Sequence, residues 1–155
     1  VLRRHDDKAV LAANMETLVR AHPGVGAWIA KVDDYTKLGG YTVTSRQARV
    51  GGAHLHDPYE PEAQAGNLAR QWLTKAGSGA VRVLGFGLGF HLEALLKNMG
   101  PEQPLEVQLA DRTLFKLCLR RRHLAHIFGD PRLRFASNLT PQTAFMLPSL
   151  AGGGA

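Results

Sequence analysis

The chain has 155 residues, of which 45% are apolar and 21% charged, which excludes a disordered chain and predicts one domain with a hydrophobic core. Its formal charge of +6 admits an anionic partner without naming one. No apolar run approaches the roughly 18 residues that a membrane helix needs, so we expect no membrane span.

The cysteine content and the first residues also indicate the cellular compartment of the protein. A single cysteine, Cys118, excludes an internal disulfide and a cysteine-based zinc site. The opening residues, VLRRHDDK, lack the apolar stretch of a secretory signal, so we expect a cytoplasmic location. The chain begins with Val1 and ends in AGGGA, and we expect both ends to be cut points or linkers in a longer protein.

The first third of the chain predicts a helix and a small antiparallel sheet. Apolar residues at helical spacing predict a helix from Asp6 or Asp7 to about His22, which Pro23 ends. Two β-prone runs, 35–38 and 41–44, flank a Gly-Gly pair and predict a hairpin. A third run over 47–50 extends this hairpin into a meander.

In the remainder, strands alternate with helices, which is typical of right-handed βαβ units and a parallel sheet. The expected elements are helices over 61–75, 90–99, 113–123 and 142–147, and strands over 81–84, 105–110 and 133–136. The predicted fold is therefore α/β: a Rossmann-like partial parallel sheet (βαβαβ) preceded by a small helix-plus-β-hairpin subdomain. We expect the subdomain to cover 1–52, the Rossmann-like half-domain 53–150, and a linker or chain end 151–155.

A glycine-rich turn between a strand and a helix is the most informative segment. Glycines alternate at Gly85, Gly87 and Gly89, where glycine permits backbone angles closed to other residues and lets a ligand approach the main chain. The following helix N-terminus supplies free amides and partial positive charge. Asp111 ends the next strand, where an acid accepts hydrogen bonds from ribose hydroxyls in Rossmann-like folds. The turn and Asp111 therefore form a candidate cofactor site.

Two interpretations of this turn stay open. The G-x-G-x-G spacing favours the glycine pattern of S-adenosylmethionine-dependent methyltransferases over that of dinucleotide dehydrogenases, with Phe86 and His91 beside the ligand. Alternatively, a tight strand-to-helix turn needs glycine only for packing, and His91 is a half-exposed histidine at the start of the helix. Val83 stands where such methyltransferases carry an acid, and Phe86 and Phe90 could fill part of the pocket.

Other polar clusters give further candidates. His56 and Tyr59 lie in a loop ahead of the helix that leads into the sheet, so we expect both to line a pocket. His54, His56 and Asp57 could ligate a metal, but two histidines and one acid leave the shell incomplete, and we predict no metal site. The basic end of the helix over 116–122 lies among leucines, so we expect a solvated or partner-facing surface and no nucleic-acid binding. No pattern assigns a catalytic residue.

Three segments, taken in order, resemble one family. Residues 55–63 (LHDPYEPEA) look like its LHSxYDPxxEA segment, and 83–96 (VLGFGLGFHLEALL) look like its GxGLGYHLEALL segment. His123-Leu124 followed by 129–133 (GDPRL) is similar to its DLSxLLxDPRL ending. These segments occur in the N-terminal regions of bacterial motility-associated-factor proteins, which glycosylate flagellin. One of the two acids in the family's EPD is absent, because residues 109–111 read Leu-Ala-Asp.

The resemblance implies an N-terminal domain of a bacterial glycosyltransferase-like protein, either accessory or binding an acceptor or a nucleotide, and inactive in isolation. With the glycine pattern of the turn, which favours S-adenosylmethionine, the expected ligand is a nucleotide sugar or S-adenosylmethionine. The expected partners are a downstream transferase domain of the same chain and a protein acceptor such as flagellin. The alternative, from a different class, is a small-molecule-binding domain of the S-adenosylmethionine-dependent methyltransferase type.

Overall fold

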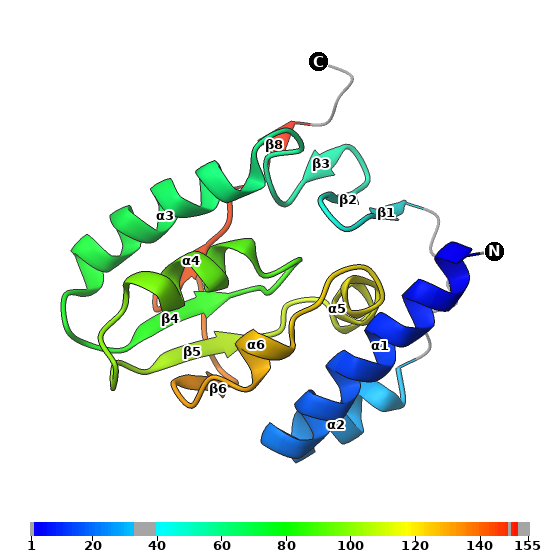
Figure 1. The fold of residues 1–155 in the computed structure, drawn as a ribbon. Helices are drawn as coiled ribbons and strands as arrows, with labels where there is room; N and C mark the ends of the chain where they lie inside the picture. Colours follow the sequence, from blue (N-terminus) through cyan, green and yellow to red (C-terminus); the bar gives the residue numbers. More distant parts are fainter. Residues whose placement is uncertain (1, 33–39, 149, 152–155) are drawn as a thin grey trace.

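The computed structural model describes residues 2–32, 40–148 and 150–151. Its helices are α1 (Leu2–Ala21), α2 (Pro23–Ala30), α3 (Pro61–Ala76), α4 (Phe90–Asn98), α5 (Arg112–Leu119) and α6 (Ala125–Phe128) (Figure 1). Its strands are β1 (Tyr41–Val43), β2 (Ala48–Val50), β3 (Ala53–His54), β4 (Val81–Leu84), β5 (Leu105–Gln108), β6 (Leu133–Phe135), β7 (Phe145–Met146) and β8 (Leu150–Ala151).

The main sheet has four parallel strands in the order β6-β5-β4-β7. The chain therefore runs outward from β4 through β5 to β6 and then returns to the other side of β4 as β7. This reversal of strand order is the topological switch point at which open α/β sheets bind ligands, outside the carboxyl ends of the strands. The predicted α/β fold with a Rossmann-like sheet is confirmed.

The helix predicted over 142–147 is wrong, because strand β7 forms there instead. Phe145 and Met146 pair in register with Val83 and Leu84 of β4. The Phe145 ring also stacks on Trp72 of α3, with centroids 5.3 Å apart. A strand of two residues has too short a pattern to be predicted from periodicity. Its formation depends on pairing with β4, which is far away in the sequence.

The second sheet is antiparallel, in the order β1-β2-β3-β8, and it contains the predicted second and third runs of the meander, paired as β1 and β2. Strand β1 pairs with β2, whereas the expected first arm of the hairpin, 35–38, lies outside the described residues. The expected boundary between residues 52 and 53 falls between β2 and β3 of this one sheet. The division into a subdomain and a half-domain stays a prediction.

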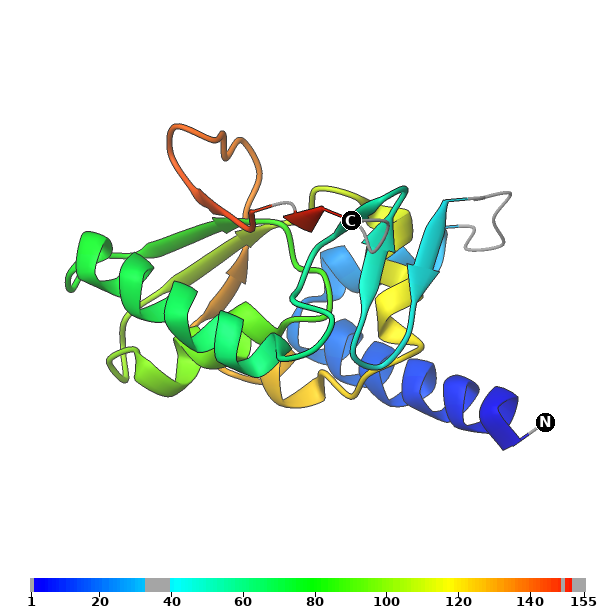
Figure 2. The ribbon, with the colours of Figure 1, turned by 90° about the horizontal axis from the view of Figure 1, so that it is seen from above.

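The parallel sheet has one buried and one polar face. Val81, Val83, Leu105 and Val107 are buried, while the alternate positions carry side chains such as Arg82, which is exposed. Helices α3, α4 and α6 lie on one side of the sheet, and the loop from β6 to β7 lies on the other (Figure 2). Period-two alternation within β4 and β5 therefore fixes which face receives the helices.

A buried asparagine attaches α1 to the rest of the molecule. The Asn14 amide nitrogen donates to the carbonyls of Leu119 and Arg122, each at 2.8 Å. Its side-chain oxygen accepts from the amide of Leu124, also at 2.8 Å. One side chain thus satisfies three backbone groups between α5 and α6, and buried polar groups of this kind need such partners.

Replacing Asn14 by leucine should lower the free energy of unfolding by about 4 kcal/mol, because three backbone groups lose their partners at about 1–3 kcal/mol each. Urea denaturation measures the loss. The matched control is Asn98→Leu, since exposed Asn98 makes one local bond to Ala94, and its change should stay within about 0.5 kcal/mol. Equal losses in the two variants would contradict the role given to Asn14.

Candidate functional site

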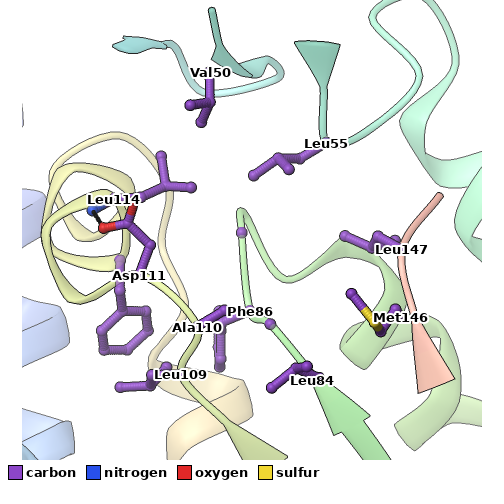
Figure 3. A pocket seen from close by; sticks show the side chains of 13 residues that line it. Val50, Leu55, Leu84, Phe86, Leu109, Ala110, Asp111, Leu114, Met146 and Leu147 are labelled. Carbon is purple, nitrogen blue, oxygen red and sulfur yellow. Dashed lines mark hydrogen bonds between the residues drawn. The ribbon is translucent and has the colours of Figure 1, made fainter. Parts of the chain in front are cut away.

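A pocket of about 300 Å³ opens at the carboxyl ends of the parallel strands, at the switch point, and the antiparallel sheet roofs it (Figure 3). Its floor comes from the segments that follow β4, β5 and β7, and its roof from β2 and the segment after β3. The lining residues are Val50, Leu55, Leu84, Gly85, Phe86, Gly87, Leu109, Ala110, Asp111, Leu114, Phe115, Met146 and Leu147.

The three glycines of the turn have different surroundings. All have positive φ, of 104° at Gly85, 54° at Gly87 and 79° at Gly89. Gly85 and Gly87 line the pocket. A Cβ on Gly87 would lie 2.6 Å from Nε2 of His56, and one on Gly89 would lie 3.0 Å from Cδ1 of Ile127. Close packing thus requires glycine at Gly87 and Gly89, whereas Gly85 faces open space.

The two phenylalanines of the turn leave the pocket open. The Phe86 ring packs into an aromatic cluster with Phe115 and Phe128, at centroid distances of 5.0 and 5.4 Å. The Phe90 ring lies against His56 at 5.2 Å and beneath the Arg122 guanidinium at 4.1 Å. Both rings are therefore used in packing.

His56 is a structural partner of the turn. Its side chain is 1% exposed, and Nε2 accepts a hydrogen bond from the Leu88 amide at 2.9 Å. The proton of the neutral ring therefore lies on Nδ1, which has no partner among the described residues. Burial, followed by the proximity of His91 and Arg122, holds the pKa of His56 well below its ordinary value.

His91 lies behind the turn and does not line the pocket. Its Nε2 donates to the Gly85 carbonyl at 3.1 Å, and burial lowers its pKa to about 4. The half-exposed position expected for His91 is wrong, because α3 and Trp72 cover it and its side chain is fully buried. Tyr59, expected beside the pocket, is 86% exposed and does not line it.

Asp111 joins the two sheets at the pocket wall. One carboxylate oxygen accepts from the Leu114 amide at 3.0 Å and caps α5, and the other accepts from the Tyr41 hydroxyl of β1. This hydrogen bond, with burial and the negative charge of Asp111, raises the pKa of Tyr41 to about 12. Sequence reasoning missed Tyr41, since an aromatic residue in a β-prone run carries no signal of a partner 70 residues away.

Arg122, from the basic segment over 116–122, binds the glycine turn through the carbonyl of Leu88. Its guanidinium donates to the Leu88 carbonyl at 2.8 Å and to the Glu93 carboxylate at 2.9 and 3.0 Å. The carbonyl and amide of Leu88 are thus held by Arg122 and His56. The positive charge of Arg122 therefore stabilises the fold.

Two further observations concern metal binding and membrane crossing by the described residues. No three His, Cys, Asp or Glu side chains in 2–32, 40–148 and 150–151 gather closely enough to hold a metal ion. None of the helices in these ranges is both long and apolar enough to cross a bilayer.

Comparison with known proteins gives a structural neighbour. No protein-family model matches the chain, and no curated protein matches it. The MAf glycosyltransferase from Magnetospirillum magneticum AMB-1 is similar in structure, with a TM-score of 0.58 and 13% sequence identity over 88% of this chain. The chain spans 28% of that neighbour's length. At this identity the likeness shows a shared fold.

Acid should destabilise the fold through its buried histidines. The pKa of His91 is about 4 in the folded state against an ordinary value of 6.5, so the unfolded chain binds more protons between these limits. The free energy of unfolding therefore falls as the pH drops from about 6.5 to 4. His91→Gln, whose amide can still donate to Gly85, should remove about 3 kcal/mol of this fall.

Urea denaturation at pH 7 and pH 4 tests this. His123→Gln removes an exposed imidazole and serves as the matched control, which should keep the wild-type pH dependence. A His91→Gln protein with the wild-type pH dependence would contradict the assignment.

The contact at Gly87 gives a second prediction for this site. Gly87→Ala places a methyl group against His56 at a positive φ, so it should cost about 2 kcal/mol or more of the free energy of unfolding. Gly52→Ala is the control, because its added methyl meets nothing within 4 Å. Thermal unfolding of the two variants should differ by several degrees, and equal midpoints would show that His56 does not pack on the turn.

Proposed function

We propose that this chain is an accessory, ligand-binding domain of a glycosyltransferase-like protein. The observation that carries the proposal is the pocket of about 300 Å³ at the switch point of the parallel sheet. Apolar pockets with a few polar groups at this position are where open α/β sheets bind small molecules. The fold shared with part of the MAf glycosyltransferase supports the transferase context.

The chemistry of the pocket supports binding without catalysis. Among the described lining residues, Asp111 is the one titratable side chain, and both of its oxygens already accept hydrogen bonds. General acid–base or nucleophilic transfer needs a positioned base or nucleophile beside the ligand. On this proposal, a transferase domain of the same protein supplies the chemistry, and a protein acceptor such as flagellin receives the sugar.

A second candidate is a methyltransferase-like domain that binds S-adenosylmethionine. The observation that favours it is the meeting of the Gly85 and Gly87 backbone with Asp111 at one pocket. On this proposal Asp111 would accept from the ribose hydroxyls and the two glycines would let the ligand approach the main chain.

A large side chain at Ala110 should fill the pocket and weaken ligand binding without unfolding the protein. Calorimetric titration with S-adenosylmethionine, S-adenosylhomocysteine, a CMP-sugar and a UDP-sugar should show micromolar binding of at least one ligand. Ala110→Trp should weaken that binding at least about tenfold, because Ala110 is exposed and lines the pocket. In parallel, the chain should release no CMP or UDP from the sugar nucleotides.

Ala12→Trp, a matched change at an exposed position of α1, should leave binding unchanged. The proposal fails if the whole panel is silent, or if Ala110→Trp binds as tightly as the wild type. Release of CMP or UDP that Ala110→Trp abolishes would instead make the pocket a catalytic site.

A further inference from the structure

We infer that the pocket selects a ligand whose buried part is an uncharged or cationic ring system, such as a nucleoside, and that it excludes phosphate. This inference rests on the proposed ligand-binding function and narrows its ligand class. In consequence, the diphosphate of a nucleotide-sugar donor does not enter this pocket. The argument depends on what lines the pocket and on where the neighbouring cations are held.

None of the described side chains that line the pocket is cationic. It consists of aliphatic and aromatic side chains, the backbone at Gly85 and Gly87, and the single carboxylate of Asp111. A phosphate leaves water only where basic side chains, metal ions or free backbone amides replace its hydration. At this turn the amides of Gly85 and Gly89 donate to the Gln108 and Phe86 carbonyls, and the amide of Leu88 donates to His56. Such a lining instead favours a flat apolar ring, which gains from contact with the aliphatic walls.

Three basic side chains of the elements around the pocket are bonded elsewhere. Arg122 is held by Glu93 and by the Leu88 carbonyl on the far side of the turn. Arg112 lies over the Trp28 ring at 4.3 Å, and Arg46 pairs with Glu62 at 2.7 Å. These cations are therefore engaged in the fold.

Arg49 precedes a lining residue in sequence but does not itself line the pocket, although its Nε is buried without a hydrogen-bond partner among the described residues. It precedes Val50, whose side chain lines the pocket from the roof. Successive side chains of a strand point to opposite faces, so Arg49 lies on the other face of β2 from Val50, opposite His54 of β3. Ala48, two positions before Val50, lies on the same face of β2 as Val50 and belongs to a buried hydrophobic cluster.

Asp111 then determines the sign of the charge that the pocket accepts. A carboxylate has about four lone-pair positions, and Leu114 and Tyr41 occupy two of them. The remaining positions can accept from ligand hydroxyl or amino groups. A phosphate near Asp111 would meet a like charge in a partly buried site, where repulsion exceeds its value in water.

The test compares adenosine, cytidine and uridine with their 5′-monophosphates by calorimetry on the whole chain. At least one nucleoside should bind, and its monophosphate should bind at least about tenfold more weakly. Asp111→Asn keeps a capping oxygen for Leu114 but removes the charge, so it should bring the two affinities closer together.

A reciprocal variant adds the missing cation. Val50 is 37% exposed at the pocket rim, so Val50→Lys should fold and should tighten monophosphate binding at least about fivefold. Val19→Lys makes the same change at a 45% exposed position on α1 and should leave both affinities unchanged.

The outcomes separate this inference from the proposed function. The exclusion of phosphate is wrong if a monophosphate binds as tightly as its nucleoside. It is also wrong if a CMP- or UDP-sugar binds and Ala110→Trp abolishes that binding. In both cases the proposed ligand-binding function still stands. If no nucleoside binds, the ligand class is wrong, and the Ala110→Trp titrations decide alone whether the pocket binds a ligand.

Discussion

The hydrogen bond from the Leu88 amide to His56 is the constraint on which the pocket depends. It joins the segment after β3 to the glycine turn after β4, across 32 residues of sequence. Arg122 holds the carbonyl of the same residue from the opposite side. Because both polar groups of Leu88 are fixed by side chains from other elements, the floor of the pocket is set before any ligand arrives. Gly87 follows from this constraint, since only a hydrogen fits under the His56 ring.

The segment LHDPYEPEA, which resembles a motif of motility-associated-factor proteins, has a structural function in this chain. Leu55 roofs the pocket and His56 holds the turn. Asp57 accepts from the amides of Tyr59 and Glu60 at 2.8 and 3.1 Å, which shapes the entry to α3. The segment therefore positions the roof of the pocket over its floor, and only Leu55 of these residues could touch a ligand.

Local patterns were sufficient to predict β4, α4, β5 and β6, where apolar strands, glycines and capping signals are close together in the sequence. They did not predict the short helix α6, and the helix expected over 113–123 ends at Leu119. They failed at β7, because a two-residue strand is defined by its pairing with β4 and by the stack of Phe145 on Trp72. The same distinction holds in the site. The positions of Gly85, Gly87 and Asp111 at strand ends were predictable, whereas the hydrogen bond of Tyr41 to Asp111 depends on tertiary structure.

The charge of +6 acquires a different meaning once its residues are located. Arg122 stabilises the turn, and Arg132 pairs with Asp130 while donating to the Leu96, Met99 and Gly100 carbonyls that end α4. The Arg132 guanidinium takes the place of a cap at the C-terminal end of α4 and links α4 to the segment between α6 and β6. Part of the positive charge of this chain thus stabilises its fold, and the affinity of a pocket that contains Asp111 for anions does not follow from the net charge.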